Sequence, residues 1–339
     1  MKAAYLVKYG SADSAFEIRE VETPQPQADQ ILIRVSGFGL NFADVMARLG
    51  LYKGAPPIPT VIGYDVVGVV EACGAGVDHV SKGDRVMALT RFGGYAEYAI
   101  AEKEVTVKIP DALAPGEAVA LATQYCTAYY LACRMANIQE GEKVLIHAAA
   151  GGVGTALTQI AIDKKCTVFG TCSSSKKIAY LKGNGVHHPI NYLTSDFESS
   201  VRSIAGDDGI DVVFDPVGGK SVKKGFRLLG SGGRILTFGA SSMNKTKSIF
   251  GKIKVLGQFG IYHPVQFLSN SKGMIGVNML KVAEDRPDKI GGVMREVVQG
   301  YHDGILKPHV GGEFHIDQLA EAHQFLQSRK SMGKVVVLW

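Results

Sequence analysis

The sequence lacks any long apolar run and any paired cysteine motif. No segment approaches the ~18 consecutive apolar residues that span a bilayer, and no apolar stretch with a cleavage site follows the opening "MKAAYLVKYG". The five cysteines are odd in number and never form C-x-x-C. We therefore expect neither a membrane span nor a secretory signal, and free thiols in a reducing cytoplasm suit this cysteine usage.

The sequence also lacks concentrated charge. The net charge is +5 and the basic residues are scattered, which argues against a nucleic-acid groove. A hydrophobic content of 46% is typical of a globular protein, and 339 residues exceed the size at which a single core usually keeps growing. We therefore expect two domains, and glycines without a fixed period indicate tight turns rather than a fibrous repeat.

The order of the sequence patterns predicts an α/β protein. Residues 1–110 are β-rich, because short apolar runs alternate with Gly, Pro and Asp. Residues 117–136 have helical spacing, and strand–turn–helix units follow from residue 143, which predicts a parallel sheet covered on both faces. The remaining expectations are a buried strand over 273–279, a helix near 292–303, a loop over 304–315, a helix over 317–329 and a final strand in "GKVVVLW".

A glycine-containing loop lies between an apolar strand and a helix in "VLIHAAAGGVGTALTQIA", residues 144–161. The spacing of Ala148, Gly151 and Gly154 is similar to the dinucleotide fingerprint, with Ala in the first place. Small residues let the backbone approach a pyrophosphate at the start of the helix. The alternative is that these glycines serve only close helix–strand packing, and the loop alone does not decide between the two.

The segment after the next strand has no acid. An NAD-binding unit places Asp or Glu about 20 residues beyond the glycine loop, where it binds the ribose 2′-hydroxyl. Here that position lies in "GTCSSSKK", which offers Ser173, Ser174, Lys176 and Lys177. These side chains suit a 2′-phosphate, so the sequence predicts NADP(H). The alternative is a polar helix start with exposed lysines.

Ordered blocks along the chain carry a family resemblance. They include "GFGLNFADVMARLGLY", "PTVIGYDVVGVVEACGAGV", "AAAGGVG", "FDPVGG", "GRILTFG" and "GKVVVL". The sequence resembles the zinc-independent quinone oxidoreductase (ζ-crystallin-like) branch of the medium-chain dehydrogenase/reductase superfamily, and within it the vesicle amine transport protein homologues. The resemblance implies a GroES-like β-rich domain over 1–122 and 280–339, an inserted Rossmann domain over 123–279, an active site between them, and a homodimer.

Metal ligands are not expected. Where zinc-dependent relatives carry a cysteine and a Gly-His-Glu, this sequence has Leu40-Asn41 and Tyr64-Asp65, and no four-cysteine lobe is present. The adjacent His187 and His188 are interpreted as surface residues.

The resemblance also implies cofactor contacts. Asn41 and Thr127 would lie near the nicotinamide, and Gly151, Gly152 and Val153 would hold the pyrophosphate. The 2′-phosphate pocket would consist of Ser173, Ser174, Lys176, Lys177 and Tyr192. The ribose and carboxamide would be closed over by Phe238, Gly239, Phe259, Gly260 and Ile261. For Phe238 and Phe259, plain core packing remains an equal alternative.

The predicted reaction is hydride transfer from NADPH to quinones or other activated α,β-unsaturated carbonyls. Without a metal, hydrogen bonds must polarise the carbonyl, which favours substrates that are already electrophilic. The resemblance implies the candidate catalytic residues, which are Tyr52, as proton donor, Tyr64, as the second candidate, and Asn41. For Tyr52, a loop tyrosine that only packs remains an equal alternative. Two alternatives stay open, namely a 2-enoyl-thioester or alkenal reductase and an NADP(H)-binding protein with little turnover.

Overall fold

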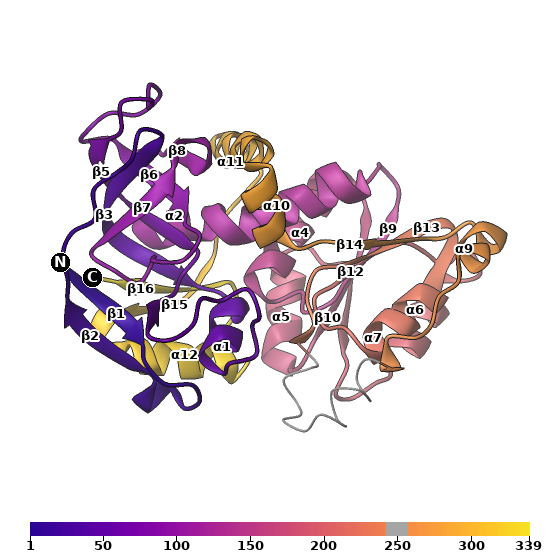
Figure 1. Ribbon diagram of the computed structural model, residues 1–339. Helices are drawn as coiled ribbons and strands as arrows, with labels where there is room; N and C mark the ends of the chain where they lie inside the picture. The colour runs from indigo at the N-terminus through magenta and orange to yellow at the C-terminus, as the bar shows by residue number, and fades with distance from the viewer. Residues whose placement is uncertain (242–256) are drawn as a thin grey trace. The chain divides into compact units, whose positions relative to one another are not determined.

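The structure is a computed structural model that describes residues 1–241 and 257–339. The chain divides into two compact units. The first contains Met1–Cys126, Leu280–Gly304 and Pro308–Trp339, and the second contains Thr127–Met279 and Ile305–Lys307 (Figure 1). The two ends of the chain therefore share one unit.

The first unit is built on mainly antiparallel sheets. The larger sheet has the order β15-β16-β3-β5-β6-β8, with β7 also paired to β3, and a smaller sheet has the order β2-β1-β4. The short strands follow from the frequent Gly, Pro and Asp between apolar runs. The strands are β1 (Lys2–Leu6), β2 (Phe16–Glu20), β3 (Gln30–Leu40), β4 (Thr60–Val61), β5 (Asp65–Cys73), β6 (Arg85–Leu89), β7 (Tyr98–Glu102), β8 (Thr106–Lys108), β15 (Val310–His315) and β16 (Lys334–Leu338).

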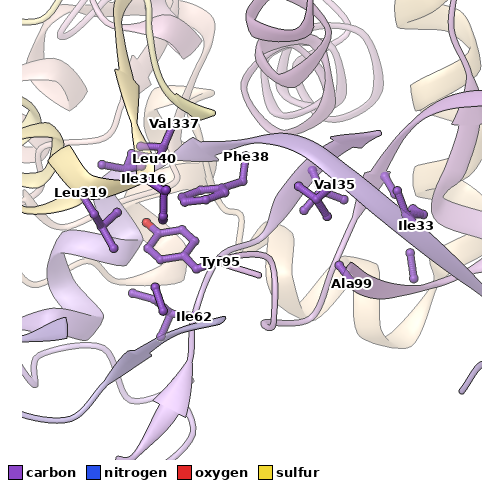
Figure 2. Packing of buried hydrophobic residues seen from close by; sticks show 14 of the residues in the cluster. Ile33, Val35, Phe38, Leu40, Ile62, Tyr95, Ala99, Ile316, Leu319 and Val337 are labelled. Carbon is purple, nitrogen blue, oxygen red and sulfur yellow. The ribbon is translucent and has the colours of Figure 1, made fainter. Parts of the chain in front are cut away.

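The core of the first unit is assembled from both ends of the chain. Figure 2 shows Phe38 and Leu40 of β3 beside Tyr95 and beside Val337 of β16, while Ile33 lies further along β3 near Ala99. The rings of Phe38 and Tyr95 stack with centroids 4.3 Å apart. Because β16 pairs antiparallel with β3, the last strand completes a core that the first residues begin.

Helices surround these sheets. The long helix expected over 117–136 is present, although it includes π-helical turns and passes from the first unit into the second. The helices of this region and of the first unit are α1 (Phe42–Arg48), α2 (Pro115–Ala120), η3 (Leu121–Tyr125), α3 (Cys126–Tyr129), η4 (Tyr130–Ala136), α10 (Met279–Asp285), α11 (Pro287–His302) and α12 (Leu319–Gln327), with short 3-10 turns η1 (Ala12–Ser14), η2 (Lys103–Val105) and η6 (Ile316–Gln318).

The second unit is a parallel sheet with the order β11-β10-β9-β12-β13-β14. In chain order this is 3-2-1-4-5-6, the doubly wound arrangement of dinucleotide-binding domains. Helices α4 and α5 lie on one face, and α6 and α7 lie on the other (Figure 1). The elements are β9 (Lys143–Ile146), α4 (Gly152–Asp163), β10 (Thr167–Cys172), α5 (Ser175–Gly183), β11 (His188–Asn191), α6 (Phe197–Ala205), β12 (Ile210–Asp215), α7 (Lys220–Leu228), β13 (Leu229–Thr237), α9 (Pro264–Asn270) and β14 (Gly273–Gly276).

The predicted α/β class with a doubly wound parallel sheet is confirmed, but two local predictions were wrong. The segment 304–315 was expected to be a loop, yet residues 310–315 form β15 beside β16, because pairing with a buried strand outweighs the low strand propensity of Gly311 and Gly312. The strand expected to be buried over 273–279 spans only Gly273–Gly276 and is half-buried to exposed, because it is the last strand of its sheet. No helix in residues 1–241 and 257–339 is long and apolar enough to cross a membrane.

Candidate active site

The glycine loop of the second unit joins β9 to α4. Ala148 adopts a left-handed backbone with φ of 52°, at the position where the fingerprint carries glycine. The N–H of Gly151 donates to the carbonyl of Ala148 at 2.9 Å, which closes a tight turn before the helix. Helix geometry leaves the first N–H groups of α4, at Gly152 and Val153, without partners inside the helix, so they are available to an anion.

The glycines of this loop have different roles. A Cβ on Gly154 would lie 2.5 Å from the carbonyl oxygen of Ala148 and 2.6 Å from Cα of Ala149, so this glycine is required for packing. Among the described residues, a Cβ on Gly151 would meet only the Ala148 oxygen, at 3.3 Å. Gly151 is thus not required by the fold, and it keeps the N-terminal end of α4 open. The packing interpretation therefore holds for Gly154, and the anion-binding interpretation stays a prediction for Gly151.

The residues predicted to hold a 2′-phosphate follow two paired strands. β10 and β11 end together, since Cys172 pairs with Asn191 and the N–H of Tyr192 donates to the carbonyl of Cys172 at 3.1 Å. Ser174 is the N-cap of α5, and its hydroxyl accepts from the N–H of Lys177 at 3.2 Å. Ser174 therefore has a structural role. Ser173, Lys176 and Tyr192 are partly or fully exposed at the same edge, and the sequence between Asp163 and Asp196 contains no Asp or Glu.

Asp215, the last residue of β12, orders the turn that follows this strand. Its carboxylate accepts from the N–H of Val217 at 2.6 Å, the N–H of Gly218 at 2.9 Å and the hydroxyl of Ser221 at 2.6 Å. Sequence reasoning missed this residue, although Asp followed by Pro and two glycines at a strand end is a turn signal.

Asp215 orders a turn that the predicted closing residues contact. A Cβ on Gly239 would lie 2.6 Å from the Pro216 oxygen, and the Phe259 ring lies against Gly218 and packs on the apolar core. For Phe259 the packing alternative therefore applies. Phe238 is half-buried next to this turn, Gly260 has φ of 95°, and Ile261 is 96% exposed. Their contacts with a cofactor remain predictions, as does that of Thr127, which is buried on α3.

His147 is a further polar residue at this edge that sequence reasoning missed. It directly follows β9 and is buried, and its Nδ1 lies 3.0 Å from the Thr171 hydroxyl. Its Nε2 has no partner among the described residues. Burial lowers the pKa of His147, so the imidazole is neutral. Nothing in the aliphatic run around it signals this position.

A polar cluster lies at one end of three strands in the first unit. Lys334 begins β16, Asp65 begins β5 and Asn41 follows β3, and the pairing of β16 and β5 with β3 brings them together. Lys334 Nζ donates to Asp65 Oδ2 at 2.5 Å and to Asn41 Oδ1 at 3.0 Å, and Asn41 Nδ2 donates to Asp65 Oδ1 at 2.7 Å. Lys334 and Asp65 are fully buried. Sequence reasoning predicted a site role for Asn41 but did not indicate Lys334.

Asp44 is a second buried carboxyl next to this cluster. It accepts from the N–H of Asn41 at 2.7 Å through Oδ2, while Oδ1 has no partner in the described residues. Burial raises the pKa of Asp44 to about 8. The carboxyl is therefore largely protonated at neutral pH, because water cannot reach the charged form.

The two candidate proton donors lie together in the first unit. Tyr64 is 8% exposed, and its hydroxyl has no hydrogen-bond partner in the described residues. Tyr52 is half-buried, with its ring edge-on to that of Tyr64 at 6.2 Å between centroids. Burial raises the pKa of both phenols, that of Tyr64 far above its ordinary value. Both therefore stay protonated at neutral pH.

Phe92 extends this aromatic group. Its ring centroid lies 5.1 Å from that of Tyr64. Its φ of 119° is strained for a bulky side chain, and such strain persists only where the surroundings hold it. Sequence reasoning missed Phe92; the pair Gly93-Gly94 after it was the available signal of an unusual turn.

Within residues 1–241 and 257–339, no three His, Cys, Asp or Glu side chains gather where they could hold a metal ion. His187 is exposed and His188 is half-buried, with His187 Nδ1 accepting from the N–H of Val168 at 3.0 Å.

Comparisons with known proteins identify the family. A family model of the alcohol dehydrogenase GroES-like domain matches residues 27–111, and one of zinc-binding dehydrogenases matches residues 184–337. The human synaptic vesicle membrane protein VAT-1 homolog is 35% identical over 343 residues, covering 100% of this chain and 86% of that protein. The chain is a medium-chain dehydrogenase/reductase. The rat quinone oxidoreductase, 30% identical over 340 residues with 100% and 98% coverage, agrees with the zinc-independent quinone oxidoreductase branch of this superfamily.

Solved structures support the same assignment for this dehydrogenase/reductase. A mycobacterial protein in complex with NADPH superposes with a TM-score of 0.87 at 29% identity and covers 100% of both chains. The CurK enoyl reductase superposes with a TM-score of 0.86 at 28% identity, covering 99% of this chain and 98% of that one. The expected GroES-like and Rossmann folds are thereby confirmed.

The two loop glycines give a matched pair of variants. We expect Gly151→Ala to unfold at the wild-type temperature but to bind NADPH about tenfold more weakly, because its methyl group narrows the anion-binding end of α4. We expect Gly154→Ala to destabilise the protein by about 1–3 kcal/mol, because its Cβ meets backbone atoms. Thermal unfolding and NADPH fluorescence titration measure both. Equal losses of stability in the two variants would contradict the separate roles.

The raised pKa of Asp44 predicts a pH dependence of stability. The unfolded carboxyl loses its proton near pH 4, whereas the folded one keeps it up to about pH 8. The unfolded state therefore binds fewer protons in this window, and the free energy of unfolding falls as pH rises through it.

Asp44→Asn removes this dependence. Burial also lowers the pKa of His323 to about 3, which makes stability fall as pH drops below about 6.5, so the window from pH 6.5 to 8 isolates Asp44. We expect Asp44→Asn to flatten the profile there in urea unfolding, while Asp78→Asn, which changes a 98% exposed carboxyl, leaves it unchanged. An unaltered slope in Asp44→Asn would show that the carboxyl is ionised in the fold.

Proposed function

We propose that this protein is an NADPH-dependent reductase of quinones and other α,β-unsaturated carbonyls. NADP(H) is its cofactor, and NADPH when bound supplies the hydride. The observation that carries the proposal is the buried hydroxyl of Tyr64, which has no partner in the described residues and lies beside the rings of Tyr52 and Phe92. A buried O–H without a partner is unfavourable unless a ligand oxygen accepts from it.

The residues around this hydroxyl favour substrates that are already electrophilic. The positions of zinc ligands in related enzymes hold Asn41 and Tyr64-Asp65, and Lys334 is paired with Asp65. Polarisation of a carbonyl then depends on hydrogen-bond donors, which is sufficient when conjugation spreads the negative charge of the product. The faces and edges of Tyr52, Tyr64 and Phe92 also suit a flat conjugated ring.

The two tyrosines have different proposed roles. Because burial holds the pKa of Tyr64 far above its ordinary value, Tyr64 acts as a hydrogen-bond donor to the developing oxyanion and keeps its own proton. Tyr52 is half-buried and therefore closer to water, so it suits delivery of the final proton. Tyr52 thus remains the candidate proton donor.

Turnover with 9,10-phenanthrenequinone tests the function. We expect the purified protein to oxidise NADPH steadily, and Tyr64→Phe to lower kcat/KM about 10- to 100-fold with no change in the pH profile between about 6 and 9. Tyr9→Phe, which changes an exposed phenol, is the control. Wild-type kcat/KM in Tyr64→Phe would exclude this hydroxyl from the reaction, and absence of NADPH oxidation with every quinone and enone would refute the function.

Two alternatives have specific support. The likeness to the CurK enoyl reductase favours reduction of 2-enoyl thioesters, which a panel of enoyl thioesters and alkenals separates from quinone reduction. The human VAT-1 homolog is named as a synaptic vesicle membrane protein and not by a reaction, which favours an NADP(H)-binding protein with little turnover. Tight NADPH binding without oxidation across the panel would favour this last candidate.

We also propose that the protein is a homodimer formed through β14. Among the described strands none pairs with the outer edge of β14, and such an edge can pair with a second copy. The segment before it carries exposed apolar side chains, with Ile261 96%, Leu268 82% and Val265 59% exposed. We expect light scattering at micromolar concentration to give twice the chain mass, and Ile275→Pro to give the monomer mass. A monomeric wild-type protein would contradict the proposal.

A further inference from the structure

The amide of Asn41 has only one orientation that satisfies its neighbours. A lysine ammonium only donates hydrogen bonds, and an ionised carboxylate only accepts them. Asn41 Oδ1 must therefore face Lys334 Nζ, at 3.0 Å, and Nδ2 must face Asp65 Oδ1, at 2.7 Å. A reversed amide would place like groups together at both contacts, so the network fixes the assignment that is otherwise ambiguous for asparagine.

In this orientation, one of the two amide hydrogens of Asn41 is not used by Asp65. Nδ2 has two hydrogens, and the bond to Asp65 uses one. The other has no acceptor in residues 1–241 and 257–339, and Asn41 is only partly buried. The amide is thus held as a directed donor that a ligand oxygen can reach.

The fold reserves space for the ammonium. A Cβ on Gly39 would lie 2.2 Å from Cε and 2.3 Å from Nζ of Lys334, so only glycine lets the lysine lie across β3. Replacing a buried ion pair by apolar side chains is often neutral or stabilising, so stability alone does not require Lys334. Apolar side chains in place of both Lys334 and Asp65 would, however, leave the amide of Asn41 free to flip.

We propose that Lys334 is a positioning residue that fixes the Asn41 amide as a directed hydrogen-bond donor to an oxygen of the bound cofactor or of the carbonyl substrate. This inference rests on the proposed function for its substrate, but not for its cofactor. Lys334 acts only through Asn41. Loss of its ammonium therefore matters only while the Asn41 amide is present.

A double-mutant cycle tests this dependence. The four proteins are the wild type, Asn41→Ala, the charge-balanced variant Asp65→Asn/Lys334→Met, and the triple variant that combines them. We expect Asn41→Ala and the charge-balanced variant each to weaken either NADPH binding or kcat/KM for phenanthrenequinone about tenfold. This is a typical effect of one lost hydrogen bond to a ligand. We expect the triple variant to be no weaker than Asn41→Ala. Gly39→Ala, which displaces the ammonium but keeps all three groups, should resemble the charge-balanced variant.

Two measurements locate the acceptor. A larger NADPH dissociation constant places the accepting oxygen on the cofactor. An unchanged constant with a lower kcat/KM for phenanthrenequinone places it on the substrate. The proposal would be overturned if the loss of NADPH affinity or kcat/KM in the triple variant equalled the product of the two separate losses. It would also be overturned if the charge-balanced variant showed no loss. If the wild type turns over no acceptor, the proposed function fails. The inference then stands only if Asn41→Ala and the charge-balanced variant each raise the NADPH dissociation constant and the triple variant raises it no further than Asn41→Ala does. Any other result means that the inference fails too.

A matched pair in the other unit controls for stability. Arg234 Nη1 and Glu142 Oε1 are 2.8 Å apart, with both side chains 19% exposed. We expect Glu142→Gln/Arg234→Met to combine with Asn41→Ala by simple multiplication, and thermal unfolding of every variant shows which changes are structural. If this control also lost its effect in the Asn41→Ala background, the cycle would be reporting general unfolding and the proposal would be withdrawn.

Discussion

The ion pair between Lys334 and Asp65 depends on the closure of the first unit by the last strand of the chain. β16 must pair with β3 in register for the ammonium to reach Asp65 and Asn41, which are 269 and 293 residues away in sequence. A buried ion pair is costly to leave incomplete, so a shift of this register would leave a buried charge without its partner. The same register brings Val337 into the core beside Phe38 and Tyr95. Register, core and polar cluster are therefore set by one pairing.

The polar cluster shows how burial determines protonation in the first unit. Asp65 has a lysine as partner, whereas the nearby Asp44 has only a backbone N–H for one oxygen and nothing described for the other. Desolvation then dominates at Asp44, and its pKa rises to about 8. The same effect keeps Tyr64 and Tyr52 protonated. The surroundings of Asn41 consequently contain hydrogen-bond donors and neutral groups next to one compensated charge pair, which suits an oxygen that becomes negative during reduction.

In the second unit, backbone geometry shapes the turns at the ends of the parallel strands. These strands end at one edge. The turns after β9, β10 and β12 are fixed by backbone N–H groups that donate to the Ala148 carbonyl, the Ser174 hydroxyl and the Asp215 carboxylate. Gly154 lets α4 approach the sheet, while Gly151 leaves the start of that helix open. Some residues predicted to contact the cofactor also have structural contacts here, among them Ser174 and Phe259. A residue in such a motif can therefore serve the fold and a ligand together.

The sequence by itself determined the features that local patterns encode. Aliphatic runs alternating with helical spacing predicted the parallel sheet, and the acid-free segment after β10 predicted NADP(H), because both depend on neighbours within about 20 residues. Only the tertiary structure decided that Lys334 meets Asn41 and Asp65, and that Phe92 is held in a strained conformation beside Tyr64. It also decided that the buried Tyr64 hydroxyl has no hydrogen-bond partner in residues 1–241 and 257–339, while Tyr52 is partly exposed. These contacts join segments up to 293 residues apart. Their burial depends on how strands pair, which no local pattern specifies.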